Sequence, residues 1–121
     1  MSTIAELLVA FVALIHVAIA VTEMFFWKSP RVHTRLGFTA DEANRVAPIV
    51  ANAGLYNAFL AAGLIWGIAA GLGNYQIQMF FLICVVIAGL FGAITLKWTT
   101  LMIQSAPAIV AILAVCASHS R

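Results

Sequence analysis

Four long apolar runs occupy most of this sequence, and they limit what the chain can fold into. The runs extend over residues 4–27, 46–72, 77–96 and 101–117. Each is close to the roughly 20 residues that a helix needs to cross a hydrocarbon core about 30 Å thick. Because the runs are continuous and do not alternate between apolar and polar residues, they predict helices rather than barrel strands. We therefore predict an all-α fold, an integral membrane four-helix bundle.

The composition excludes a water-soluble globule. Hydrophobic residues make up 64% of the chain and charged residues 8%, with a mean hydropathy of +1.10, whereas a soluble domain carries about 25% charged residues. We expect a single membrane domain, 1–121, with the lipid bilayer as its surroundings. The predicted spans are about 4–27, 48–71, 77–96 and 99–117, and the predicted cytoplasmic loop is 28–45.

The first run has a second interpretation, a cleaved signal peptide. Ala18-Ile19-Ala20 resembles the small-residue site at which such peptides are cut. Signal peptides begin with basic residues, however, and Met1-Ser2-Thr3 contains none. An uncleaved first span is therefore the favoured interpretation.

The basic residues predict the orientation. Lys28, Arg31, Arg35 and Arg45 lie between the first two runs, and Lys97 lies between the last two. The positive-inside rule places both loops in the cytoplasm and both termini on the outer side of the cytoplasmic (inner) membrane, with 71–76 as the short outer turn. Basic residues spread in this way form no groove for phosphates, so no nucleic-acid partner is expected.

The loop at 28–45 contains a helix start signal. Thr39 and Glu42 fit a capping box, which predicts a helix that begins at Ala40. Pro48 either begins the membrane span or lies inside one continuous helix. The charged residues of this loop, and His33, are interpreted as solvated groups and not as a site.

Glycines four residues apart indicate close helix packing. Gly63, Gly67 and Gly71 share one face of the second span, where small residues let another backbone approach. Packing within the bundle is the favoured interpretation, and the seam of a homodimer is the alternative. Gly89 and Gly92 in the third span predict the same kind of contact.

The first span carries an ionisable pair, His16 and Glu23. These residues are seven apart, so they lie within about 20° of one helix face and about 10 Å apart along the axis. A glutamate in hydrocarbon costs at least about 2.5 kcal/mol, and such residues therefore face the bundle interior and have partners. The pair predicts a site that exchanges protons or binds a ligand.

Counting residues from the loops places other polar groups near this pair. Glu23, Asn52 and Gln104 fall roughly 6 to 10 Å below the cytoplasmic surface, while His16 and Tyr56 lie deeper. These five are the predicted ligand-binding or proton-exchange residues. A second tier consists of Trp27, Asn57 and Thr100. Asn57 is about 140° around the helix from Asn52, which predicts a different neighbour or a backbone contact.

No metal and no cofactor are expected. One histidine and one glutamate about 10 Å apart are not two ligands of one ion, and no His-x-x-x-His pair is present. His119 falls on the outer side, away from His16. Cys84 and Cys116 lie inside apolar runs and are interpreted as buried small side chains.

Several of these residues carry a resemblance to a known family. The matching elements are His16, Glu23-Met24, Trp27, "NAGLYNAFLAAGLIWG" from Asn52 to Gly67, and "QSAPAIVA" from Gln104 to Ala111. The sequence resembles the small bacterial membrane proteins classified as domain of unknown function 1304 (DUF1304). The resemblance implies a four-helix integral membrane protein and assigns no activity.

Two classes of function remain open. In the first, the protein binds or transports a small cationic or amphipathic molecule in exchange for a proton, with Trp27, Tyr56 and Trp66 as aromatic walls. It resembles the small multidrug resistance transporters in length, in its four spans and in a first-helix glutamate, although Glu23 is nearer one surface. In the second, it is an intramembrane enzyme for a lipid-like or isoprenoid substrate, with Glu23 or His16 as general acid or base.

Overall fold

The computed structural model describes residues 2–71 and 74–120, and within them every regular element is a helix. The long helices are α1 (Thr3–Phe25), α3 (Ala40–Ala69), α4 (Asn74–Thr95) and α5 (Ala106–His119), the last preceded by a π-helix, η2 (Leu101–Ser105). Four segments of the described chain are long and apolar enough to cross a membrane, with η2 and α5 forming one of them. The all-α, four-helix prediction is confirmed. The predicted turn at 71–76 lies partly outside the described residues.

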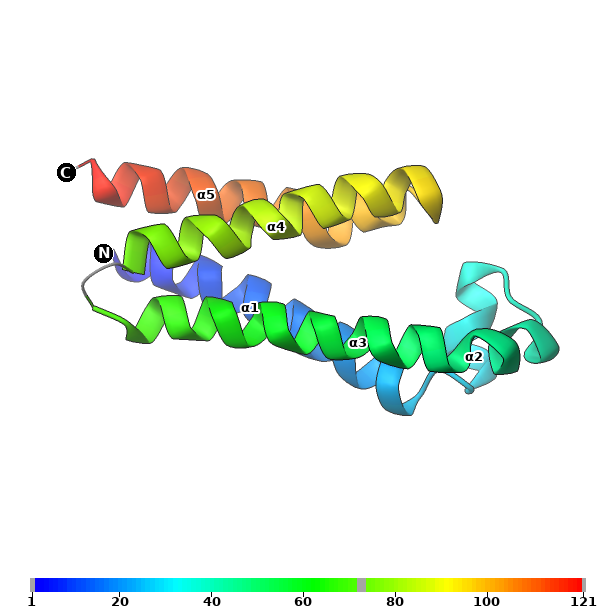
Figure 1. The fold of residues 1–121 in the computed structure, drawn as a ribbon. Helices are drawn as coiled ribbons and strands as arrows, with labels where there is room; N and C mark the ends of the chain where they lie inside the picture. Colours follow the sequence, from blue (N-terminus) through cyan, green and yellow to red (C-terminus); the bar gives the residue numbers. More distant parts are fainter. Residues whose placement is uncertain (1, 72–73, 121) are drawn as a thin grey trace.

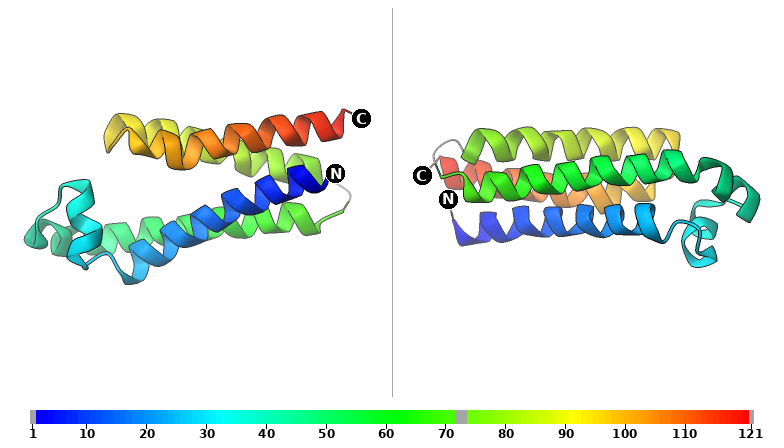
Figure 2. Two further views of the ribbon diagram at one scale, coloured as in Figure 1. Left: turned by 180° about the vertical axis from the view of Figure 1, so that it is seen from behind. Right: turned by 60° about the horizontal axis from the view of Figure 1, so that its bottom comes forward.

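The helices form two antiparallel pairs (Figures 1 and 2). One pair consists of α1 and α3, and the other of α4 and the η2–α5 segment, and both chain ends lie at the same end of the bundle. The pairs are close together at that end and separate toward the opposite end, where the α1–α3 connection lies.

The buried core lies in the half of the bundle near the termini. It uses the first half of α1, the second half of α3, the middle of α4 and most of the length of α5. Its central members are Ala5, Val9, Val12, Leu64, Leu82, Val85, Ala108, Ala111 and Val115. Apolar contact therefore joins all four helices at one end only, and the other half of the bundle is where the polar groups of α1 and α3 lie.

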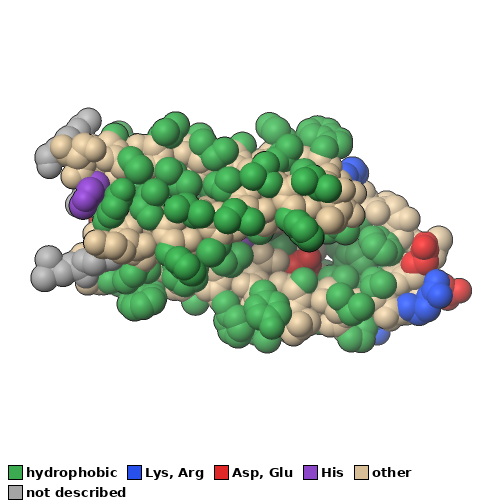
Figure 3. Space-filling view, turned by 45° about the horizontal axis from the view of Figure 1, so that its top comes forward, with side chains coloured by type: hydrophobic (Ala, Val, Ile, Leu, Met, Phe, Trp, Pro, Cys, Tyr) green, Lys and Arg blue, Asp and Glu red, His purple; other side chains and the backbone are tan. Residues whose placement is uncertain are grey.

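The outer surface of the bundle is also apolar. Leucine, isoleucine, valine and phenylalanine side chains are exposed on all four long helices, and Figure 3 shows them covering one face of the molecule. A soluble monomer rarely exposes more than a few hundred Å² of contiguous apolar surface. This surface is suited to contact with lipid tails.

The α1–α3 connection is structured. It contains α2 (Pro30–His33) and a 3-10 helix, η1 (Thr34–Leu36), which ends at Gly37 with a left-handed φ of 80°. The His33 side chain is only 3% exposed, and its Nδ1 donates to Phe38 O at 3.0 Å. The prediction that His33 is solvated is wrong, because the imidazole is covered by its edge-on contact with Trp27 and by the chain around Phe38.

The capping box at the start of α3 is confirmed. Thr39 Oγ1 accepts from the Glu42 amide at 3.2 Å, and Glu42 Oε1 accepts from the Thr39 amide at 2.9 Å. The helix begins at Ala40 as predicted and continues through Pro48. Of the two alternatives for Pro48, the structure therefore has the single continuous helix.

Close glycine contacts hold the helix pairs together. A Cβ on Gly67 would lie 2.6 Å from Gln78 Cγ of α4, and one on Gly63 would overlap the Phe81 ring. Both glycines thus face α4 in the same chain, and a homodimer would need a different surface. Gly71 does not share this contact: its φ is 66°, nothing lies within 4 Å of a Cβ built on it, and it follows the end of α3.

The last span begins with a wider helical turn. In a regular helix the Pro107 ring would clash with the carbonyl four residues earlier and leave it without a donor. The chain here forms η2, in which the Ala106 amide donates to Leu101 O, five residues back, and Pro107 follows in the first turn of α5. This π-helix was not predicted from the sequence. Single π turns are frequent at functional sites.

Candidate functional site

The Glu23 carboxylate of α1 is held by Asn57 of α3. Asn57 Nδ2 donates to Glu23 Oε1 at 2.9 Å and to the Ala53 carbonyl at 3.1 Å. Both side chains are half-buried. Asn57, expected in the second tier, is therefore the side chain that binds Glu23 among the described residues, and it also makes the predicted backbone contact.

Gly54 explains why these two helices come close enough for this bond. A Cβ at that position would lie 3.0 Å from Glu23 Cβ, 2.8 Å from Met24 Cγ and 3.1 Å from the Ala20 carbonyl oxygen. Without a side chain there, α3 packs directly on α1. Asn57 follows one helical turn later on the same face and so meets the carboxylate.

Glu23 also lines an open groove on the side of α1. The groove has a volume of about 600 Å³, which falls within the roughly 300 to 1,000 Å³ of small-molecule sites. Its apolar walls are Ile15, Ala18 and Ile19 of α1, Val32 and Leu36 of the connection, and Ile103 of η2. Its polar residues are Thr22, Glu23, Trp27, Arg31 and Arg35. Figure 3 shows an acidic side chain in a hollow of the apolar surface, away from the charged end.

Trp27 forms a fixed wall of this groove. Only 4% of the residue is exposed, and its Nε1 donates to Ala43 O of α3 at 2.9 Å. The ring also packs edge-on against Phe38, at 5.4 Å between ring centroids. Trp27 is therefore a buried wall of the groove, whereas Trp98 is 65% exposed.

His16 lies outside the groove. Its side chain is fully buried, and Nδ1 donates to the Val12 carbonyl at 2.8 Å, which makes Nε2 an acceptor in the neutral ring. The Gln104 side chain of η2 lies beside the imidazole, but Nε2 has no hydrogen-bond partner in the described part of the chain. The predicted polar layer is thus divided into a Glu23–Asn57 pair and a His16–Gln104 pair.

Asn52 and Tyr56 lie away from both pairs. Each is two residues from Gly54, so each is about 160° around α3 from the face that contacts α1. Both are exposed, and Tyr56, at 60%, packs edge-on against Phe59. The structure therefore does not bring them to Glu23. Gly54, Asn57 and Ala61 share one face of α3, and this pattern in the sequence could have indicated the side that contacts α1.

Thr100, expected in the second tier, and Trp66, expected as an aromatic wall, do not line the groove. Thr100 Oγ1 donates to Gly89 O of α4 at 2.9 Å, so this hydroxyl fastens the α4–η2 connection. Ser105 Oγ of η2 likewise donates to Val86 O at 2.9 Å. Trp66 is 59% exposed on the outer surface of α3.

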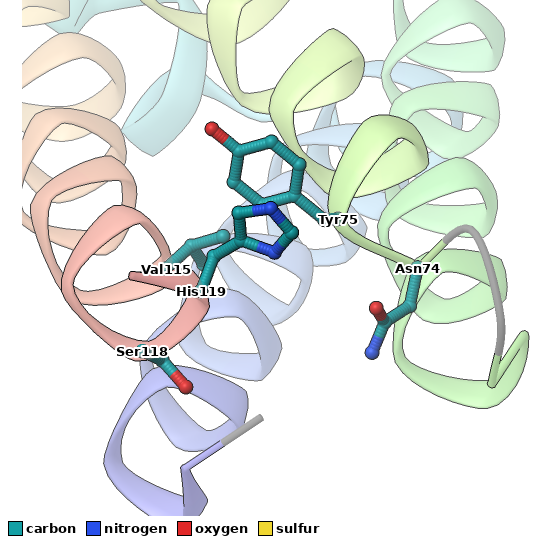
Figure 4. Close-up of a pocket in the computed structure, with 5 residues that line it drawn as sticks. All are labelled: Asn74, Tyr75, Val115, Ser118 and His119. Atoms are coloured by element: carbon teal, nitrogen blue, oxygen red, sulfur yellow. The ribbon is translucent and has the colours of Figure 1, made fainter. Parts of the chain in front are cut away.

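A smaller pocket lies at the end of the bundle that carries the termini (Figure 4). It has a volume of about 150 Å³ and is lined by Asn74, Tyr75, Val115, Ser118 and His119. The His119 and Tyr75 rings stack at 3.8 Å with an interplanar angle of 13°. Among the described residues, no group of three or more histidine, cysteine, aspartate or glutamate side chains could hold a metal ion.

Comparison with known proteins gives one match. Neither the curated proteins nor the solved structures contain a match to this chain. A family model does match, over residues 10–116, which cover both pairs of polar side chains and the groove. The chain therefore belongs to the family described as "Protein of unknown function (DUF1304)".

Proposed function

We propose that this protein binds a cationic amphipathic molecule from the bilayer in the α1 groove, and that Glu23 releases a proton as it takes the cation. In this proposal both termini lie on the outer side of the cytoplasmic membrane, so the groove opens in the cytoplasmic leaflet. Lys28, Arg31, Arg35 and Lys97 at that end of the bundle support the orientation through the positive-inside rule.

The observation that carries the proposal is the position of the Glu23 carboxylate on an apolar groove. An ionised carboxylate among apolar side chains costs at least about 2.5 kcal/mol. A proton offsets that cost when the groove holds no ligand, and a bound cation also offsets it. Exchange of one for the other is the simplest chemistry of such a site.

The geometry leaves room for a ligand at Glu23. Asn57 bonds Oε1, and within the described residues Oε2 has no hydrogen-bond partner. The apolar wall formed by Ile15, Ile19 and Ile103 suits a hydrocarbon tail. Trp27, held by its bond to Ala43, closes this part of the groove as a rigid wall.

Proton release on ligand binding tests the proposal. Dodecyltrimethylammonium is a suitable probe because its quaternary nitrogen carries no proton, so any proton released comes from the protein. Purified protein in a nonionic detergent, titrated in weak buffer, should release up to one proton for each probe bound. The Glu23→Gln variant should release none.

Glu6→Gln is the matched control, since Glu6 lies on the same helix at the opposite end and does not line the groove. It should release protons as the wild type does. An unchanged pH in the wild-type titration, with binding established by calorimetry, would contradict the proposal. Equal release by wild type and Glu23→Gln would remove Glu23 from this role.

A further inference from the structure

Two arginines lie at one end of the groove, beyond the carboxylate that the proposed function uses. Arg31 and Arg35 both line the groove, and both side chains are exposed. They belong to the consecutive short helices α2 and η1. The hydrogen bond of the Glu23 carboxylate is to Asn57 and not to either arginine. A ligand that carries only a cation would therefore leave both guanidinium groups without a partner.

The groove presents its chemical groups in a fixed order along α1. The apolar side chains of Ile15, Ala18 and Ile19 precede Glu23 on this helix. From Ile15 to Glu23 the wall extends about 12 Å, at 1.5 Å per residue. The helix ends at Phe25, and the two arginines follow on the connection. The order is thus an apolar wall, then an anion, then cations.

Backbone contacts hold the connection that carries the arginines. Lys97 Nζ, after α4, donates to the Arg35 carbonyl at 3.0 Å. Trp27 Nε1, at the start of the connection, donates to Ala43 O of α3 at 2.9 Å. Neither bond uses a guanidinium group, so the arginine side chains can be substituted without loss of these contacts.

Formal charges favour one kind of ligand over another. When Glu23 is protonated, the charged residues that line the groove are the two arginines, with a total charge of two. A simple cation that replaces the proton leaves this total unchanged, whereas a zwitterion also brings an anionic group and lowers it to one. Like charges repel, and an oxyanion accepts paired N–H bonds from a guanidinium group. The groove is therefore better suited to a zwitterion.

We propose that the ligand is a zwitterionic amphiphile whose ammonium group is joined directly to the hydrocarbon tail and whose anionic group is terminal, as in an alkyl betaine. The tail lies along Ile15 and Ile19, the ammonium pairs with Glu23, and the terminal oxyanion binds Arg31 and Arg35. This inference rests on the proposed function for the cationic centre at Glu23, and it adds the anionic group and the residues that bind it.

Three probes with the same dodecyl tail test this order. Dodecyltrimethylammonium carries a cation alone, dodecyl sulfobetaine carries an ammonium and then a sulfonate, and dodecylphosphocholine carries a phosphate and then an ammonium. Each is titrated into purified protein in a nonionic detergent, and calorimetry gives the dissociation constant after subtraction of a titration into protein-free micelles. Wild type should bind dodecyl sulfobetaine about fivefold more tightly than either other probe, the upper range for an exposed ion pair. Equal affinities for dodecyl sulfobetaine and dodecylphosphocholine would overturn the proposal.

An arginine variant separates the two ends of the ligand. R31Q/R35Q should lose the preference for dodecyl sulfobetaine over dodecyltrimethylammonium, because the sulfonate then has no cationic partner. It should bind dodecyltrimethylammonium at least as tightly as the wild type does, because two repelling charges are gone. If the double variant has a lowered melting temperature without probe, the single variants R31Q and R35Q give the same comparison. A preference that persists unchanged in these variants would contradict the role of the arginines.

K28Q/R45Q is the matched control, because Lys28 and Arg45 are exposed near the same end but do not line the groove. This variant removes the same amount of charge and should keep the wild-type preference for dodecyl sulfobetaine. Equal losses of the preference in K28Q/R45Q and R31Q/R35Q would also overturn the proposal, since the effect would then be general surface charge.

Proton release separates the failure of this inference from that of the proposed function. Dodecyl sulfobetaine should release protons as dodecyltrimethylammonium does, because its sulfonate stays ionised and its quaternary nitrogen carries no proton. If both probes release protons but bind with equal affinity, the further inference fails and the proposed function stands. If neither probe releases a proton from the wild type, the proposed function fails and takes with it the ammonium contact on which this inference rests.

Discussion

Asn57 Nδ2 donates a hydrogen bond to Glu23 Oε1 across 2.9 Å, and this bond joins α3 to α1 on the edge of the groove. Glu23 is an acidic residue that lines the α1 groove, and Asn57 lies 34 residues further along the chain. The amide binds one carboxylate oxygen, and among the described residues the other has no hydrogen-bond partner. The bond therefore contributes both to helix association and to the position of the group that we propose to exchange a proton.

Removal of the amide should weaken the α1–α3 contact. We expect Asn57→Ala to lower the free energy of unfolding by about 1 kcal/mol, because Glu23 then has no partner in a partly buried site. Asn52→Ala, on the exposed face of the same helix, should change it by less than about 0.5 kcal/mol. Unfolding by denaturant in detergent micelles measures both, and equal values for the two variants would contradict the role of Asn57.

Added volume at Gly54 should separate α1 from α3. A Cβ added at Gly54 would lie 3.1 Å from the Ala20 carbonyl oxygen, and this backbone atom cannot move unless α1 moves with it. We expect Gly54→Val to destabilise the protein by about 1 to 3 kcal/mol and to abolish probe binding at Glu23. Ala53→Val, next to it but exposed, is the control and should remain near wild type. A stable, binding-competent Gly54→Val protein would show that this helix contact is not needed.

The two glycines of α4 should differ in their tolerance of alanine. A Cβ on Gly89 would lie 2.8 Å from the Ser105 backbone nitrogen and would overlap its hydroxyl, whereas one on Gly92 meets only the Thr100 side chain, at 3.0 to 3.3 Å. Gly89→Ala should therefore cost about 1 to 3 kcal/mol and Gly92→Ala clearly less, since a side chain yields more easily than backbone. Thermal unfolding of the two variants gives the order, and the reverse order would contradict this packing.

Cysteine labelling in intact cells should report the proposed orientation. In a background with Cys84→Ala and Cys116→Ala, a cysteine at Asn74 or Ser118 should react with a membrane-impermeant maleimide added outside the cell. A cysteine at Arg45 should react only after the membrane is opened. External labelling of Arg45→Cys would place the groove in the other leaflet and reverse the topology that we propose.

The sequence was sufficient for those features that depend on neighbouring residues. The apolar runs predicted the four long helices, and Thr39 with Glu42 predicted the first residue of α3. Glu23 was singled out because a carboxylate in an apolar run is costly, and the structure places it half-buried against Asn57. These inferences need only local hydrogen bonding and the free energy of transfer into hydrocarbon.

Only the tertiary structure decided which face of each helix meets its neighbour. Helical periodicity places Asn52 and Tyr56 on one side of α3 and Gly54 and Asn57 on another. In a membrane either side is apolar enough to face the lipid, so the sequence pattern does not show which side packs against α1. The close approach at Gly54 turned Asn57 toward Glu23 and left Asn52 and Tyr56 exposed. The groove beside Arg31 and Arg35 likewise depends on tertiary contacts, because residues of α1, of the α1–α3 connection and of η2 meet there.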